Sequence, residues 1–155
     1  MTRRQLEHEL EADSFDADTI RRATKNYVEP DCPLMSRMDE LLGLPGAGLH
    51  YLLLADTGMG KTSFLLNYFN HNQKRRASKR LRIMMVSLNR PGALGTLEAV
   101  QPKTEAVAFL DAFDEDIGAI ESRERRMQEI MAVCRDFKCV VIACRTQFLS
   151  NDEEI

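Results

Sequence analysis

Four short apolar runs are spread along the 155-residue chain, and segments with helical periodicity separate them. The apolar runs are 50–55 (HYLLLA), 81–88 (LRIMMVSL), 105–110 (EAVAFL) and 139–144 (CVVIAC). The segments with a helical pattern between them are 61–77, 94–101 and 118–136. Apolar strands that alternate with helices predict a parallel sheet with both faces buried. We therefore expect an α/β fold of three layers, with a mostly parallel sheet between two layers of helices.

The first 45 residues have a different texture and predict helices without strands. We expect helices at 2–12, 16–28 and 34–43, with a rigid proline-containing linker at 27–33. The chain therefore divides into a helical N-terminal segment, 1–45, and an α/β core, 46–155. The core ends in the polar sequence SNDEEI soon after its last strand, so we expect it to be incomplete at its C-terminus.

Composition and charge exclude several classes of protein. The chain is 44% apolar and 29% charged with a net charge of −3, which indicates one globular domain rather than a disordered tail. No apolar run approaches the roughly 18 residues of a membrane span, and no secretory signal precedes the first helix. We expect a soluble cytoplasmic protein that does not bind membranes.

Two further features suggest no chemistry of their own. Cations crowd the segment 74–82, KRRASKRLR, but it contains no aromatic residue to stack on a base, so we interpret it as a solvated helix end and consider nucleic acid an improbable partner. The cysteines lack the spacing of a zinc site or a disulfide framework, so we expect buried or bystander thiols. They are Cys32, Cys134, Cys139 and Cys144.

The segment 55–62, ADTGMGKT, fits the phosphate-binding Walker A pattern, with alanine in the place of the first glycine. It follows an apolar strand and precedes a helical pattern, as this motif requires. Glycines let backbone N–H groups face a phosphate, the lysine contacts the β- and γ-phosphates, and the threonine hydroxyl ligates Mg²⁺. The expected nucleotide-binding residues are Thr57, Gly58, Met59, Gly60, Lys61, Thr62 and Ser63. The alternative is a glycine-rich turn with a solvated lysine.

A second motif ends the third apolar run in a carboxylate, Asp111, as a Walker B strand does. Asp111 and Thr62 are the expected ligands of Mg²⁺ or of its water. Many P-loop ATPases have a glutamate next, but this chain has Ala112, and its acids follow at Asp114 and Glu115. We expect one of these two to polarise the attacking water. The alternative is an acidic helix start, which suits Asp116 best.

Arg145 follows the fourth apolar run, at the strand end where ligands bind in open α/β sheets. A guanidinium at this position could contact the γ-phosphate and distinguish a triphosphate from a diphosphate. The alternative is a salt bridge to the acidic loop at 114–116.

Taken together, the sequences ADTGMGKT, FLDAFDE and VVIACRTQF resemble the NACHT-type branch of the STAND class of P-loop NTPases. This class contains signalling ATPases, among them bacterial antiphage proteins and animal innate-immune sensors. The displaced acids, Asp followed by a small residue, an apolar residue and Asp-Glu, are the specific mark. The resemblance covers about residues 27–155.

The resemblance implies an additional-strand P-loop core, in which the strand at 139–144 lies between the P-loop strand and the Walker B strand. It implies that Asp114 or Glu115 orients the attacking water and that Arg145 senses the γ-phosphate. It also implies that binding and slow hydrolysis of Mg·ATP switch the protein between a closed monomer and an open, self-associating state. Members of the class continue beyond this point with a further strand, a lid or winged-helix region and usually a repeat array. Weak ATPase activity is therefore the expectation.

Two other functions fit the same P-loop. One is a small-molecule or nucleoside kinase, which needs a lid with arginines and an acceptor pocket. The other is a degenerate nucleotide-binding module without turnover, whose N-terminal helices dock a protein partner.

Overall fold

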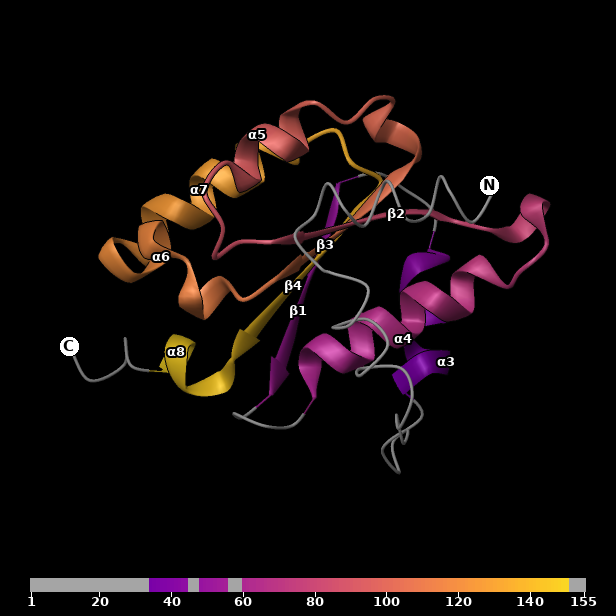
Figure 1. Cartoon of the computed structure of the whole chain (residues 1–155), viewed down its shortest axis with the longest axis horizontal. Coiled ribbons are helices and arrows are strands. Elements are labelled where there is room, and N and C mark those ends of the chain that lie inside the picture. The colour runs from indigo at the N-terminus through magenta and orange to yellow at the C-terminus, as the bar shows by residue number, and fades with distance from the viewer. Residues whose placement is uncertain (1–33, 45–47, 56–59, 151–155) are drawn as a thin grey trace.

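The computed structural model describes residues 34–44, 48–55 and 60–150 (Figure 1). The helices expected at 2–12 and 16–28 lie outside these residues. The described part is an α/β structure built around one sheet of four parallel strands.

The sheet has the strand order β1-β4-β3-β2, and every pair of neighbours is parallel. The strands are β1 (Leu49–Ala55), β2 (Arg82–Ser87), β3 (Ala106–Asp111) and β4 (Cys139–Arg145). All four predicted strands are confirmed, with bounds that shift by one residue at most. The expected position of the fourth strand, between the first and the third, is also confirmed.

Helices cover both faces of the sheet (Figure 1). The helices on one face are α3 (Leu34–Leu42) and α4 (Lys61–Gln73), and those on the other are α5 (Ala93–Glu98), α6 (Ile117–Glu121) and α7 (Arg123–Val133). A short helix, α8 (Thr146–Ser150), follows β4, and single 3-10 turns form at Ala77–Lys79, Lys103–Glu105 and Phe113–Glu115. Among the described helices, none combines the length and the apolar character needed to cross a membrane.

Two hydrophobic cores, one on each face, hold these layers together. Successive side chains of a strand point to opposite faces, so each central strand contributes to both cores. On the α4 side, Phe109 and Val141 pack with Tyr68, while Leu110 and Ile142 belong to the core on the α7 side. Burial on both faces explains why β2, β3 and β4 have apolar runs without polar alternation.

The helix expected at 61–77 is shorter than predicted and ends at Gln73. The cause is Asn72, which is fully buried near the end of α4. Its side-chain amide donates to the carbonyl oxygen of Leu81 at 2.6 Å and accepts from the N–H of Leu81 at 3.0 Å. These two bonds return the chain toward β2 a few residues earlier than helical periodicity suggests.

The single helix expected at 118–136 is wrong, because the structure has two helices there. Ser122 separates α6 from α7 with an extended backbone, φ −155° and ψ 96°. Serine favours helix ends over helix interiors because its hydroxyl competes for backbone hydrogen bonds. The helix α8 was not predicted from the sequence. Of the polar sequence SNDEEI, residues 151–155 lie outside the described residues.

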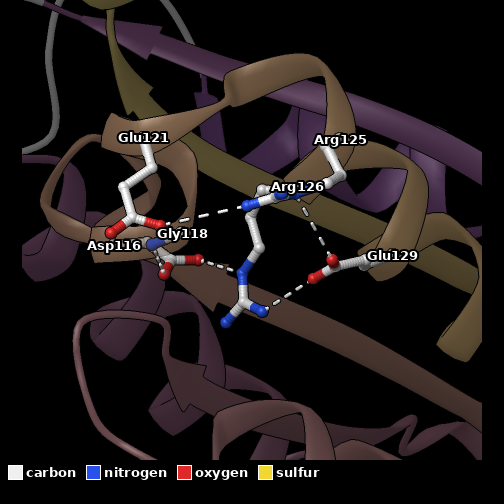
Figure 2. Close-up of polar contacts among 6 residues, drawn as sticks. All are labelled: Asp116, Gly118, Glu121, Arg125, Arg126 and Glu129. Carbon is white, nitrogen blue, oxygen red and sulfur yellow. Dashed lines mark hydrogen bonds and ion pairs between the residues drawn. The ribbon is translucent and has the colours of Figure 1, made fainter.

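A buried ion pair fixes the junction between α6 and α7 (Figure 2). The Asp116 carboxylate caps α6 by accepting the N–H of Gly118 at 3.1 Å, and it accepts a second bond from Arg126 Nε at 2.7 Å. Arg126 also contacts Glu129 at 3.0 Å. The side chain of Asp116 is almost fully buried. Asp116 therefore has the helix-start role that the sequence left as its alternative.

The strand β1 has an exposed apolar side. Among the described strands it pairs only with β4, so one of its two edges has no described partner. Leu52 and Leu54 are 49% and 43% exposed. Their register partners Ile142 and Cys144 belong to the core under α5 and α7, so the leucines lie on that same face, beyond the reach of its helices.

We predict that Asp116→Ala lowers the free energy of unfolding by about 2–4 kcal/mol, because it removes a helix cap and leaves Arg126 without its buried partner. Chemical denaturation followed by circular dichroism measures this change. Glu121→Ala is the matched control, because its 3.9 Å contact with Arg125 is exposed and contributes about 0–1 kcal/mol. Equal losses of unfolding free energy in the two variants would contradict the conclusion that Asp116 stabilises the junction between α6 and α7.

Candidate functional site

The candidate site lies at the edge of the sheet where the four parallel strands end. Ligands bind outside the carboxyl ends of the strands in open α/β sheets. The residues there are Ala55 at the end of β1, Ser87 at the end of β2, Asp111 at the end of β3 and Arg145 at the end of β4. Two of these, Asp111 and Arg145, are predicted site residues.

A short hydrogen bond joins the two motifs of the sequence. The hydroxyl of Thr62, in the first turn of α4, donates to Asp111 Oδ2 at 2.6 Å, across 49 residues of chain. Lys61 Nζ donates to the carbonyl oxygen of Ala55 at 3.2 Å, which brings the start of α4 close to the end of β1. Of the expected nucleotide-binding residues, Thr57, Gly58 and Met59 lie outside the described residues.

The start of α4 has the features of an anion site. Gly60 precedes the helix in the left-handed conformation, φ 77°, which glycine adopts without strain. It offers no side chain to cap the helix, and the first turn contains no acidic residue. The first N–H groups of a helix lack partners within the helix and carry a partial positive charge. They favour an anionic ligand in front of Lys61, Thr62 and Ser63.

Burial of the Asp111 carboxylate destabilises the protein when no ligand is bound. Asp111 is 5% exposed, and this burial raises its pKa above the usual value. The hydroxyl of Thr62, the N–H of Ala112 and the charge of Lys61 oppose the rise in pKa, while the negative charge of Glu115 adds to it. Ala112 itself has φ 60°, a conformation that few non-glycine residues adopt. Strain and a buried charge therefore coincide at the end of β3.

The acidic loop after β3 pairs with Arg145. Arg145 Nε lies 3.0 Å from Asp114 Oδ2, and the backbone N–H of Arg145 donates to Asp114 Oδ1 at 3.3 Å. A longer contact of 3.9 Å joins Arg145 to Glu115. This is the salt bridge to the acidic loop that the sequence left as the alternative for Arg145. A pocket of about 200 Å³ opens beside it, lined by Asp114, Arg145, Gln147 and Phe148.

The two acids of this loop differ in environment. The side chain of Asp114 is 8% exposed and is held by Arg145 through an ion pair and a backbone hydrogen bond. The side chain of Glu115 is 52% exposed. Glu115 is therefore the acid that solvent can reach.

Sequence reasoning missed two polar residues at the end of β2. Asn89 Nδ2 donates to Glu115 Oε2 at 3.0 Å, and the hydroxyl of Ser87 donates to Asn89 Oδ1 at 2.5 Å. The signal for them was available, because the polar residues in SLN follow an apolar strand of a parallel sheet as Asp111 and Arg145 do.

The cysteines of the described residues belong to the core. Cys134, Cys139 and Cys144 are free and buried, as predicted, and burial raises the pKa of each thiol to about 11. Cys32 lies outside the described residues. In the part of the chain that the structure describes, no group of three or more His, Cys, Asp or Glu side chains is arranged to hold a metal ion.

No protein-family model matches the chain, and no curated protein matches it significantly. The geometry at the strand ends and the residue motifs are therefore the basis for a function.

We predict that Asp111→Asn raises the melting temperature of the protein without ligands at neutral pH. Unfolded Asp111 loses its proton near its usual pKa of 3.8 and folded Asp111 at a higher pH, so stability falls as the pH rises through this window and stays lower above it. An uncharged amide avoids the loss, and about 1 kcal/mol corresponds to roughly 2–4 °C. Calorimetry at pH 7 tests this, and a melting temperature below that of the wild type would contradict it.

Proposed function

We propose that this chain is the nucleotide-binding module of a switch protein, which binds Mg·ATP and hydrolyses it slowly. The observation that carries the proposal is the hydrogen bond between Thr62 and Asp111. It joins the threonine of a Walker A sequence to the carboxylate of a Walker B strand. The strand order β1-β4-β3-β2 supports the same conclusion, because it is the order that the resemblance to NACHT-type STAND NTPases implies. Self-association in one nucleotide state is part of this proposal.

The residues at the start of α4 fit the phosphates of a nucleotide. Lys61 provides a point charge within reach of Ala55 O, and the helix terminus provides N–H donors without a competing side-chain cap. A phosphate would replace the carbonyl of Ala55 as the partner of Lys61, and it would gain a charge-assisted hydrogen bond.

The residues also fit Mg²⁺. This ion keeps several waters and is held by one or two protein oxygens together with phosphate oxygens, so it needs no cluster of three acids. Thr62 and Asp111 would hold it or its water, and the buried carboxylate of Asp111 would regain a nearby positive charge. When bound, the ion would offset negative charge on the phosphates.

Glu115 fits the water-orienting role better than Asp114. A base must reach a water molecule, and the half-exposed side chain of Glu115 can do so. Its charge also acts on Asp111, which places it near the end of β3. Asp114 is engaged by Arg145 through two contacts and serves to hold that residue. A γ-phosphate would compete with Asp114 for Arg145, which gives Arg145 a way to respond to a triphosphate.

We predict that saturating MgATP raises the melting temperature of the wild-type chain. At a hundred times Kd the added stability is about 2.7 kcal/mol, or roughly 5–10 °C for a domain of this size. Lys61→Ala should abolish the shift without changing the fold, because Lys61 begins α4 outside both cores. Thermal melts with MgATP, MgADP and MgGTP, followed by circular dichroism, measure this.

Lys79→Ala is the matched control for these melts, because Lys79 is an exposed lysine beyond the opposite end of α4. It should keep the full shift. A wild-type melt that nucleotide leaves unchanged would overturn the proposed function, and equal shifts in the wild type and in Lys61→Ala would place binding elsewhere.

We predict that Glu115→Gln keeps MgATP affinity and lowers the turnover number by about 100-fold, the usual contribution of a general base. Asp114→Asn should lower turnover less and should weaken the anchoring of Arg145. Phosphate release under saturating MgATP measures turnover, and calorimetric titration measures affinity. A larger loss in Asp114→Asn would move the role to Asp114, and full turnover in both variants would mean that neither acid orients the attacking water.

A further inference from the structure

A chain of three polar side chains runs from the end of β2 to the acidic loop. The hydroxyl of Ser87 donates to Asn89 Oδ1 at 2.5 Å, and Asn89 Nδ2 donates to Glu115 Oε2 at 3.0 Å. Ser87 is buried, whereas Asn89 and Glu115 are exposed. The chain thus connects the interior of the sheet to the acid that solvent reaches.

The direction of the hydrogen bonds in this chain follows from the chemistry of its members. An ionised carboxylate only accepts hydrogen bonds, so the amide of Asn89 must turn its NH₂ group toward Glu115. The amide oxygen then faces Ser87, whose hydroxyl can donate to it. Ser87 therefore selects the orientation of Asn89 that offers a donor to Glu115.

The backbone around Asn89 is held to the end of β3. Leu88 is buried, and its N–H donates to the carbonyl oxygen of Asp111 at 2.9 Å. The N–H of Arg90 donates to the carbonyl oxygen of Ser87 at 3.3 Å and closes a turn around Asn89. The turn and the bond to Asp111 together fix the backbone of Asn89 beside the end of β3. The short loop that carries Glu115 follows this strand end.

We propose that Asn89 is a positioning residue that limits the Glu115 carboxylate to a long contact with Arg145. Glu115 has two neighbours that differ in charge. The neutral amide of Asn89 lies at 3.0 Å and the cationic guanidinium of Arg145 at 3.9 Å. Without Asn89, the half-exposed carboxylate would move closer to the guanidinium and shorten the 3.9 Å contact to a hydrogen-bonded ion pair. A carboxylate held in that way points at the guanidinium and is no longer directed at a water molecule.

This inference rests on the proposed function, because it assigns Asn89 a part in orienting the base for ATP hydrolysis. It predicts that turnover depends on Asn89 and that nucleotide binding does not. The described contacts of Asn89 go to Ser87 and Glu115 and not to Lys61, Thr62 or Asp111. Loss of Asn89 should therefore change turnover and leave nucleotide binding intact.

The test is steady-state ATP hydrolysis by Asn89→Ala. We expect kcat to fall by about threefold to tenfold, the effect of losing one typical hydrogen bond, with KM for MgATP and the melting temperature unchanged. Asn89→Asp should lower kcat further, because two carboxylates then face each other. Asn89→Gln keeps the amide donor and should recover part of the rate. Gln128→Ala, an exposed amide on α7, is the matched control and should behave as the wild type.

Coupling between the two residues is the second part of the test. In the Glu115→Gln background, Asn89→Ala should cause no further loss of kcat, because the base that Asn89 positions is already absent. Independent losses that multiply would overturn the proposal. A fall in melting temperature or a rise in KM in Asn89→Ala would also overturn it, because either would indicate a merely structural role.

A spectroscopic measurement tests the contact without turnover. In ¹⁵N-labelled protein the side-chain NH₂ signals of Asn89, assigned by their absence in Asn89→Asp, should move in Glu115→Gln and in Ser87→Ala. They should stay in place in Glu98→Gln, a control at the end of α5. Signals that ignore Glu115→Gln would overturn the inference.

The outcomes distinguish the two proposals. A wild-type chain that neither binds nor hydrolyses MgATP would overturn the proposed function and this inference with it. Turnover that depends on Glu115 but not on Asn89 would overturn this inference alone.

Discussion

The hydrogen bond from Thr62 to Asp111 requires a particular arrangement of strands and helices, and much of this fold provides that arrangement. Its two residues stand at the start of α4 and at the end of β3, and β4 lies between β3 and the strand that leads to α4. The bond can form only if α4 crosses the sheet toward β3, and the rings of Tyr68 and Phe109, 5.9 Å apart, show that crossing in the core. Strand order, helix packing and the polar edge are thus parts of one arrangement.

The same edge of the sheet concentrates unfavourable features that packing elsewhere must offset. A carboxylate is buried at Asp111, the next residue adopts a left-handed conformation, and the start of α4 lacks a side-chain cap. Each costs stability in a protein without ligands, and strain of this kind gathers at functional sites. The contrast within the molecule is informative, because α6, which begins just after the acidic loop, has an aspartate cap and a buried arginine partner.

The strands were predictable from local pattern, and their order followed from the resemblance to NACHT-type STAND NTPases. The meeting of Thr62 and Asp111 was predictable as well, because parallel topology brings the ends of the strands to one edge. Other features depend on contacts between distant side chains, which no local pattern encodes. The end of α4 depends on Asn72 meeting Leu81, and the break at Ser122 accompanies the pairing of Asp116 with Arg126. The position of Asn89 at the strand ends was predictable, but its hydrogen bond with Glu115 depends on the loops after β2 and β3 lying side by side.

The exposed side of β1 affects how the protein behaves at high concentration. A strand edge without a neighbour presents unpaired N–H and C=O groups, and a hydrophobic edge of this kind promotes aggregation. β1 is seven residues long, and Leu52 and Leu54 add apolar surface beside the edge that has no partner among the described strands. The other edge strand of the described sheet, β2, has no exposed apolar residue, so chains in a concentrated preparation would join edge to edge through β1. A lysine in place of either leucine would act as a gatekeeper and extend the range of concentrations at which the protein stays monodisperse.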